Sequence, residues 1–337
     1  MSHRRCSFLY WLLAAGAIVV LLGWANGTRG VRTGLPDGGA TRAQVLQGRY
    51  LVTAVSACSD CHSPKPGMEP GDAGWLSGGT ETFTVGPWKS RGSNLTPDKA
   101  TGLGRWTARQ IFNALKDGKD REGHSLCPPM PSANYYNMTD DDLWAMVAYL
   151  QNVKPVRNQV PEPQGPPAPD ADRPMPVFPA ANETPSSDPQ VVRGRYLVTA
   201  AACGDCHSPT AKPTDPFGPA NPKWMSGSDR PFTVGEWTTY APNLTPDRTT
   251  GLGDWSARQI RRALQTGQDD EGRMLCPPMP SAAVYHNLTA ADALAIAAYL
   301  QSIKPVSNAV PEPKGPPCPK TVPTLPPYPA AQEVNVP

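Results

Sequence analysis

The first apolar pattern along the chain is an unbroken run from Cys6 to Ala25, preceded by two arginines. A run of about 20 apolar residues is long enough to cross a bilayer as one helix, and the arginines favour the cytoplasm for its start. We therefore expect a transmembrane anchor over residues 1–25 and a flexible tether over residues 26–43. A cleaved signal peptide is the alternative, because Ala25 begins a weak small-residue cleavage site.

Three helical patterns follow the tether. Residues 44–57 have a helical pattern that Gly48 interrupts. A second helix is expected to begin at Thr107, where a glutamine three residues later completes a capping box, and to end at Gly118. A third helix is expected to begin at Thr139, with an acidic residue three positions later. Its apolar face consists of Leu143, Met146, Val147 and Leu150.

Each of these patterns occurs twice. Residues 191–202 repeat the first helix, and Gly194 repeats its glycine. The later helix starts are repeated by Ser256 with Gln259 and by Thr289 with Asp292. Matched loop segments are Asn94 to Asp98 with Asn243 to Asp247, Thr101 to Gly104 with Thr250 to Gly253, and Cys127 to Pro131 with Cys276 to Pro280. The repeat predicts an all-α fold in which one domain is duplicated, with copies at residues 44–167 and 190–317.

The first helix of each copy contains an interior glycine, and its presence requires a physical explanation. An interior glycine costs about 1 kcal/mol relative to alanine. We expect Gly48 and Gly194 to let the third helix cross closely, with Tyr149 or Tyr299 at the contact.

Proline marks the connections. The chain has 42 prolines in 337 residues, far above the usual share of about one in twenty. Residues 154–167 recur almost intact as 304–317, so we expect both runs to pack on their domains. A proline-rich linker is expected over residues 168–189 and a proline-rich tail over 318–337.

A CxxCH motif follows the first helix in both copies. This motif is the attachment signature of c-type haem, in which two thiols bind the porphyrin and the adjacent histidine binds the iron. Zinc would need a second ligand pair at short spacing, and a thioredoxin-like pair would need a βαβ setting, so both hypotheses are weaker. The sequence predicts two haem c groups, held by Cys58, Cys61 and His62 and by Cys203, Cys206 and His207.

The second axial ligand separates an electron carrier from a catalyst. A residue that serves both haems should occur at matched positions, and among the methionines only Met130 and Met279 do. Both lie in a Cys-Pro-Pro-Met-Pro segment, where prolines restrict the backbone. The alternative is that they fill core space, as methionine often does. The unmatched His124 and His286 are expected to be surface histidines.

Four cysteines lie outside the motifs. In an oxidising compartment a bridge between Cys127 and Cys276 is conceivable. We favour the alternative that they are small buried hydrophobic residues. The other two are Cys6 and Cys318.

The order of the motifs resembles a known family. Each copy has CxxCH, an Asn-Leu-Thr-Pro-Asp segment, Thr-Gly-Leu-Gly, Pro-Pro-Met-Pro and a helix ending in Ala-Tyr-Leu. This order is similar to the class I-like cytochrome c domains in the multihaem cytochrome c subunits of membrane-bound, periplasm-facing dehydrogenases. The resemblance covers about residues 44–167 and 190–317, although such subunits commonly carry three haems and this chain has two motifs. It implies iron ligation by His62 with Met130 and by His207 with Met279, and pockets edged by Trp88, Trp237, Asn94 and Asn243.

We therefore expect two tandem cytochrome c domains after an N-terminal transmembrane helix, anchored to the cytoplasmic membrane with the haem domains in the periplasm. The expected role is to relay electrons from a periplasmic dehydrogenase or a quinol-linked donor to a respiratory acceptor, without catalysis by the chain itself. Redox proteins are the expected partners, because a net charge of +2 gives no case for nucleic acid. A dihaem peroxidase-like enzyme and a dihaem subunit of a terminal oxidase are the alternatives.

Overall fold

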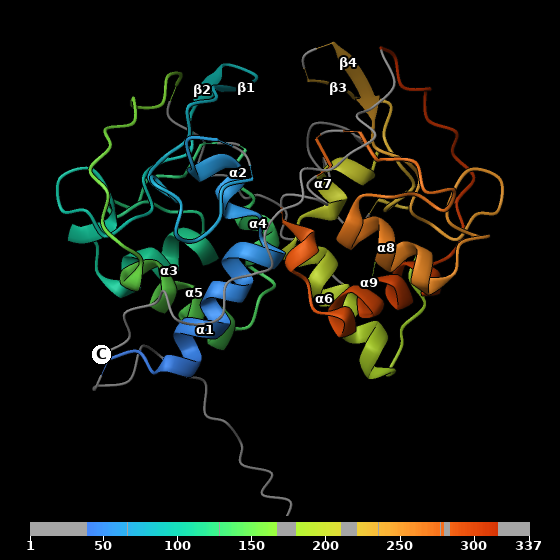
Figure 1. Ribbon diagram of the computed structural model, residues 1–337, viewed down its shortest axis with the longest axis horizontal. Helices are drawn as coiled ribbons and strands as arrows, with labels where there is room; N and C mark the ends of the chain where they lie inside the picture. Colours follow the sequence, from blue (N-terminus) through green and yellow to red (C-terminus); the bar gives the residue numbers. More distant parts are fainter. Residues whose placement is uncertain are drawn as a thin grey trace, which may run out of the picture. The chain divides into compact units, whose positions relative to one another are not determined.

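The computed structural model shows two copies of a small, mostly helical unit (Figure 1). The first copy runs from blue to green and the second from yellow to red. The structure describes residues 39–65, 67–127, 129–166, 180–209, 221–234, 236–276, 278–279 and 284–315.

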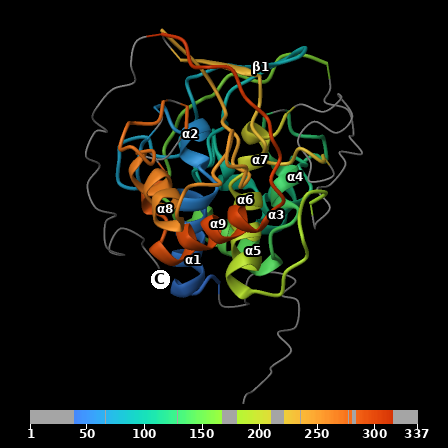
Figure 2. The same ribbon diagram turned by 90° about the vertical axis from the view of Figure 1, so that its right-hand side faces the viewer.

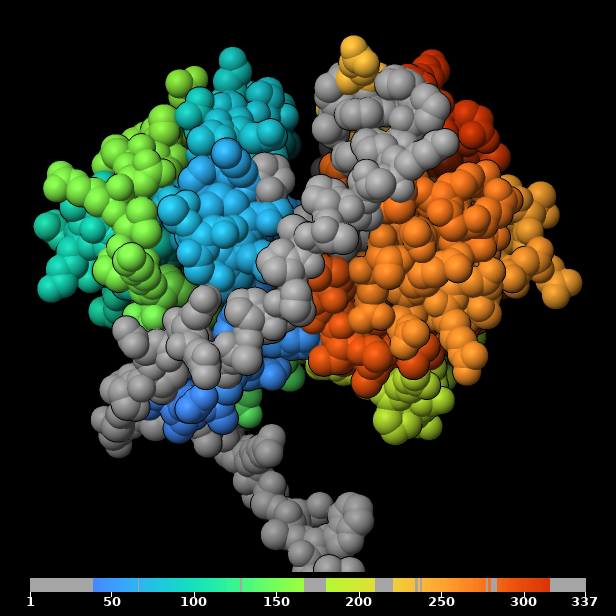
Figure 3. Space-filling view, in the orientation of Figure 1, coloured from blue at the N-terminus to red at the C-terminus, as the bar shows by residue number. Residues whose placement is uncertain are grey.

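The first copy contains helices and one hairpin. Strands β1 (Phe83–Val85) and β2 (Trp88–Ser90) pair antiparallel, with Phe83 opposite Ser90. This hairpin projects at the top of the first copy in the space-filling view (Figure 3). The helical elements are α1 (Arg42–Tyr50), the π-helical turn η1 (Leu51–Val55), α2 (Cys58–His62), the 3₁₀ turn η2 (Leu103–Arg105), α3 (Ala108–Lys116), α4 (Ser132–Tyr135) and α5 (Asp140–Asn152).

The second copy repeats this order. Strands β3 (Pro231–Val234) and β4 (Trp237–Tyr240) form the matching hairpin, with Pro231 opposite Tyr240. The helical elements are α6 (Pro189–Ala200), α7 (Cys203–His207), α8 (Ala257–Thr266), the 3₁₀ turn η3 (Tyr285–Asn287) and α9 (Ala290–Ser302). The fold is therefore mostly helical and contains two β-hairpins. The expectation of an all-α fold did not include these hairpins.

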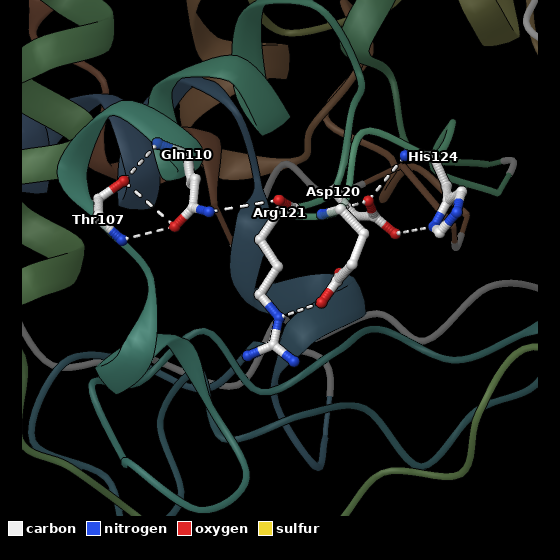
Figure 4. Close-up of polar contacts among 6 residues, drawn as sticks. Thr107, Gln110, Asp120, Arg121 and His124 are labelled. Carbon is white, nitrogen blue, oxygen red and sulfur yellow. Dashed lines mark hydrogen bonds and ion pairs between the residues drawn. The ribbon is translucent and has the colours of Figure 1, made fainter.

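The second helix of each copy starts as the sequence predicts. The Thr107 hydroxyl accepts the backbone N–H of Gln110, and the Gln110 side chain accepts the backbone N–H of Thr107 (Figure 4). Ser256 and Gln259 form the same capping box at α8. At the third helix, Thr139 caps α5 through its hydroxyl alone. Local sequence is sufficient for these starts because each bond spans only three residues.

The first and third helices of each copy cross in close contact. Figures 1 and 2 show α6 against α9, and α1 packs on α5 in the same way. A side chain at Gly48 would collide with the carbonyl of Ala145 and would lie 2.9 Å from Cβ of Tyr149. Gly194 meets the carbonyl of Ala295 in the same way. The expectation of a close crossing at both glycines is confirmed.

The segment after the third helix packs back on its own copy, as predicted. The Asn94 amide donates to the carbonyl of Val156 at 2.8 Å, and the Asn158 amide donates to the carbonyl of Ser77 at 2.9 Å. In the second copy, Asn243 and Asn308 make the equivalent bonds.

The end of the expected linker belongs to the second copy. The Asn182 amide donates to the carbonyl of Trp224 at 2.9 Å. Buried Glu183 accepts a hydrogen bond from Arg195 in α6 at 2.9 Å. The linker predicted over residues 168–189 therefore includes residues that are part of a folded unit.

The two copies exchange a matched pair of hydrogen bonds. The Tyr50 hydroxyl donates to Asp292 at 2.6 Å, and the Tyr196 hydroxyl donates to Asp142 at 2.5 Å. Tyr50 and Tyr196 are equivalent in the repeat, as are the two aspartates. The contact is therefore self-complementary, because each copy contributes the same donor and the same acceptor.

His286 takes part in this contact between copies. Its Nε2 lies 3.0 Å from a carboxylate oxygen of Glu69, and its side chain is 18% exposed. The prediction of a surface histidine at this position was wrong, because the ring is covered by a residue from the other copy.

No helix among the described residues is long and apolar enough to span a bilayer. This finding corrects the expectation of a chain held on the cytoplasmic membrane by an N-terminal helix. The segment 1–25 lies outside the described residues.

The Gly48→Ala variant tests the close crossing. Helix propensity alone would favour alanine by about 1 kcal/mol. We expect the opposite sign, a loss of about 1–3 kcal/mol, because the methyl group would collide with the Ala145 carbonyl. Urea unfolding of the holoprotein measures the difference, with exposed Arg42→Ala in α1 as the control. Equal or higher stability of Gly48→Ala would show that the crossing has room for a side chain.

Asp292→Asn tests the hydrogen bonds that Asp292 accepts from Tyr50 of the first copy and from Arg193 of its own copy. Burial would raise the pKa of Asp292, but hydrogen bonds from Arg193 and Tyr50 hold it below its usual value. A lowered carboxyl pKa stabilises the fold above about pH 3.8, and this contribution is lost as pH falls through the folded pKa.

We therefore expect Asp292→Asn to cost about 1.5–3 kcal/mol at pH 7, the usual range for hydrogen bonds to charged groups. The difference from wild type should shrink below pH 3.8. Unfolding of both proteins at pH 7 and at pH 3 provides the comparison, and exposed Asp141→Asn is the control. A pH-independent difference would contradict the role of the ionised carboxylate.

Candidate haem sites

Each CxxCH motif forms a single helical turn that is entered through a left-handed residue. Ala57 precedes α2 with φ 49°, and Ala202 precedes α7 with φ 53°. Positive φ is uncommon for residues other than glycine. The backbone N–H of Asp60 donates to the carbonyl of Ala57 at 3.1 Å, and Asp205 and Ala202 repeat this bond. The same tight turn therefore presents the motif at the end of the first helix in both copies.

The motif histidines are oriented by backbone carbonyls. Nδ1 of His62 lies 2.8 Å from the carbonyl of Ser93, and Nδ1 of His207 lies 2.9 Å from the carbonyl of Pro242. A carbonyl can only accept, so Nδ1 carries the proton and the lone pair of Nε2 remains for a metal. Burial lowers the pKa of both imidazoles and so favours the neutral form that binds metals.

All four motif cysteines are free, half-buried thiols. Burial raises the pKa of Cys58 and of Cys203 to about 12, and that of Cys61 to about 11. The four sulfur atoms are thus not consumed by disulfides and are compatible with thioether bonds to a porphyrin.

One cavity reaches both motifs. Its volume is about 2960 Å³, well above the usual range of about 300–1,000 Å³ for a pocket that holds one small molecule. Both copies contribute matched apolar walls, which suit the flat faces of a porphyrin. These walls include Leu103, Trp106 and Ile111 from the first copy and Leu252, Trp255 and Ile260 from the second.

Met130 and Met279 line the same cavity as the motif histidines. Each is half-buried and follows the same turn, with its backbone N–H 3.4 Å from the carbonyl of Cys127 or Cys276. The structure therefore brings together the eight residues that the sequence selected. The donor set fits haem c, because each copy offers two thiols, a neutral imidazole with a free Nε2 and a thioether.

His124 is engaged outside the cavity lining. Its Nδ1 lies 3.3 Å from a carboxylate oxygen of Asp120, and its side chain is 78% exposed (Figure 4). The equivalent Arg273 pairs with Asp269 at 2.7 Å. This position closes a surface loop in both copies, as expected for a surface histidine.

The residues expected to edge the pockets have different roles. Asn94 and Asn243 line the cavity and also hold the segment that follows the third helix. The Trp88 indole donates to the carbonyl of Pro166 at 2.9 Å and so closes the hairpin onto that segment. The side chain of Trp237 lies outside the described part of the structure.

Cys127 and Cys276 are not bridged to each other. Cys127 is a free, half-buried thiol, whereas Cys276 is disulfide-bonded. Within the described ranges no group of three or more His, Cys, Asp or Glu side chains could hold a metal ion.

Two polar contacts to the second motif were not anticipated from the sequence. The Asn134 amide of the first copy lies 3.1 Å from both carboxylate oxygens of Asp205. Arg230, before β3, donates to the backbone carbonyl of Asp205 at 2.8 Å. Burial raises the pKa of Asp205 to about 6, against the effect of these two neighbours. Neither contact belongs to the repeat, so comparison of the copies could not reveal them.

Comparisons with known proteins agree with this geometry. A family model described as "Cytochrome C oxidase, cbb3-type, subunit III" matches residues 43–150, and one described as "Cytochrome c" matches residues 191–304. The chain is 34% identical to the gluconate 2-dehydrogenase cytochrome c subunit of Pantoea cypripedii over 70% of this chain and 54% of that protein. It is 31% identical to the fructose dehydrogenase cytochrome subunit of Gluconobacter japonicus over 87% of this chain and 59% of that protein.

A diheme cytochrome c-type protein of Cereibacter sphaeroides is also similar. It is 26% identical over 86% of this chain and 97% of its own length. By contrast, the chain spans between half and three fifths of the two dehydrogenase subunits. The chain therefore consists of two tandem, mostly helical cytochrome c domains that carry two haem c groups, and it is similar to the cytochrome c subunits of dehydrogenases.

Proposed function

We propose that the chain is an electron-transfer protein in which both haems have histidine and methionine as axial ligands. The ligand pairs are His62 with Met130 and His207 with Met279. The haem domains span residues 44–167 and 190–317 and belong to the class I-like type. The chain itself catalyses no reaction on a substrate.

One observation carries the proposal. In both copies an imidazole with its Nδ1 held by a carbonyl and a methionine at a matched position line the same cavity. A ligand needed by both haems is expected at equivalent positions, and these methionines satisfy that condition. His124 and His286 do not satisfy it, because their equivalents in the other copy are Arg273 and Tyr136.

The protein residues perform attachment, orientation and shielding. The two thiols of each motif would hold a haem through thioether bonds. The carbonyls of Ser93 and Pro242 fix the histidine tautomer and ring orientation. When bound, haem c supplies an iron that exchanges one electron between its ferric and ferrous states. An iron held by both histidine and methionine would have no position left for peroxide or oxygen, which argues against the peroxidase-like alternative.

A dehydrogenase is the proposed electron donor. The names of the two similar subunits, from a gluconate 2-dehydrogenase and a fructose dehydrogenase, support this class of partner. The proposed acceptor is a component of a respiratory chain.

Removing each methionine tests the ligand assignment. Met130→Ala and Met279→Ala should each remove about half of the thioether–iron charge-transfer absorption of the ferric protein, because one of two equivalent ligands is lost. Haem content should stay at two per chain, because the cysteines still hold both haems. Met138→Leu is the control, since the second copy has Leu288 at that position. Full absorption in either alanine variant would contradict the assignment for that haem.

A subunit of a terminal oxidase is the second candidate function. The family model that matches residues 43–150 is named after an oxidase subunit, which favours this candidate. Purification of the tagged full chain from its native host under mild conditions distinguishes the two candidate functions. We expect a dehydrogenase activity that reduces both haems to purify with the chain. Oxygen consumption in the purified complex without a dehydrogenase would support the oxidase candidate instead.

A further inference from the structure

The two copies differ by a reversed charge beside the haem motif. Five residues after equivalent Leu76 and Met225, the first copy has Glu81 and the second has Arg230. Both side chains line the haem cavity. Equivalent positions on the cavity wall thus carry opposite charges in the two copies.

Arg230 is held against the motif itself. Its guanidinium donates to the backbone carbonyl of Asp205, between the two motif cysteines, at 2.8 Å. It also lies over the ring of Phe232, 4.7 Å from the ring centroid. The Arg230 side chain is half-buried, whereas Glu81 is exposed. The positive charge is therefore fixed and partly shielded from water, and the negative charge in the first copy is more strongly screened.

The other acidic residues around the cavity differ less between the two copies than Glu81 and Arg230 do. Three acidic positions are shared, as Asp60 with Asp205, Asp120 with Asp269, and Glu162 with Glu312. Their effects on the two haems are of the same sign.

Of the cavity-lining residues that the structure describes, the unmatched cations other than Arg230 are exposed. Arg91 stands opposite Tyr240 in the repeat and donates to Thr82. Arg121 pairs with Glu122 at 2.6 Å, and Arg273 pairs with Asp269 and Glu271. Exposed charges act through water and are screened by salt. Among the described residues that line the cavity, Arg230 is thus the unmatched charge in direct contact with a haem motif.

A fixed cation favours the reduced haem. Reduction lowers the positive charge at iron by one, so a nearby guanidinium destabilises the ferric state relative to the ferrous state. Burial acts in the same direction, because a less polar environment disfavours the more charged ferric form. His207 is 7% exposed and His62 is half-buried. Both effects raise the potential of the second haem relative to the first.

We propose that Arg230 sets the direction of electron flow, from the haem of the first copy to the haem of the second. This proposal rests on the electron-transfer function proposed above. In the step, the iron held by His62 is oxidised from ferrous to ferric and the iron held by His207 is reduced from ferric to ferrous. One electron moves and no proton is exchanged, since Arg230 stays protonated throughout.

Redox titration of the purified holoprotein, followed by haem absorbance, tests the proposal. Wild type should show two one-electron steps, and Arg230→Gln should lower only the upper step. We expect the equilibrium constant for reduction of this haem to fall about tenfold, which lowers its potential by about 59 mV for one electron. Arg230→Lys keeps the charge and should retain most of the upper potential, which separates a charge effect from a structural one. Arg91→Gln is the control for an exposed cation and should leave both steps in place.

Assignment of the steps uses a variant without the second haem. Cys203→Ser with Cys206→Ser should retain one haem and show one step at the lower potential. An unchanged upper step in Arg230→Gln, a shift of the lower step instead, or a remaining step at the upper potential would each overturn the proposal. The charge-transfer absorption reports the axial ligands independently, so failure of the ligand assignment and failure of this inference give different results.

Discussion

The close crossing of the first and third helices is the constraint on which each haem site depends. The first helix leads into the CxxCH turn, and the third helix follows the loop that carries the methionine. At Gly48 and Gly194 the absence of a side chain lets one helix approach the backbone carbonyl of the other. The crossing fixes where one helix ends and where the other begins. It therefore holds a histidine and a methionine that are 68 or 72 residues apart in the chain on the walls of one cavity.

The contact between copies reuses the start of the third helix. A carboxylate in the first turn of a helix is favoured by the helix dipole, and Asp142 and Asp292 are both in that position. Each also accepts a hydrogen bond from the tyrosine of the other copy. A duplicated domain that carries both donor and acceptor makes such a contact twice, as in a two-fold symmetric dimer. The bond from Asn134 to Asp205 breaks this symmetry, because the second copy has a different sequence at that place.

Features with short-range causes could be predicted from the sequence, whereas features formed between distant segments could not. The capping boxes at Thr107 and Ser256 depend on residues three positions apart, and both formed as predicted. Asp142 has the same spacing from Thr139, but its carboxylate is occupied by Tyr196 from the other copy. The capping pattern in the sequence does not show that a tyrosine from the other copy binds this carboxylate.

The same limit explains the other differences. His286 has no partner nearby in sequence, so its burial against Glu69 depends on the contact between copies. Asn182 and Glu183 are polar and follow a proline-rich run, yet both are buried by partners in the second copy. Met130 and Met279, which both line the cavity, were selected on a different basis. The repeat supplied an internal comparison, which replaced the missing three-dimensional information.

The repeat identifies what the two haem sites share, and departures from it identify what can make them differ. Two sites with the same axial ligands gain nothing from those ligands in driving an electron from one to the other. A difference in potential must then arise from burial and from charges that are not matched. Arg230 meets this condition, because it replaces an acidic residue, contacts the motif backbone and is shielded on one side by Phe232. Since a guanidinium stays charged at all ordinary pH values, the charge that Arg230 itself contributes does not depend on pH.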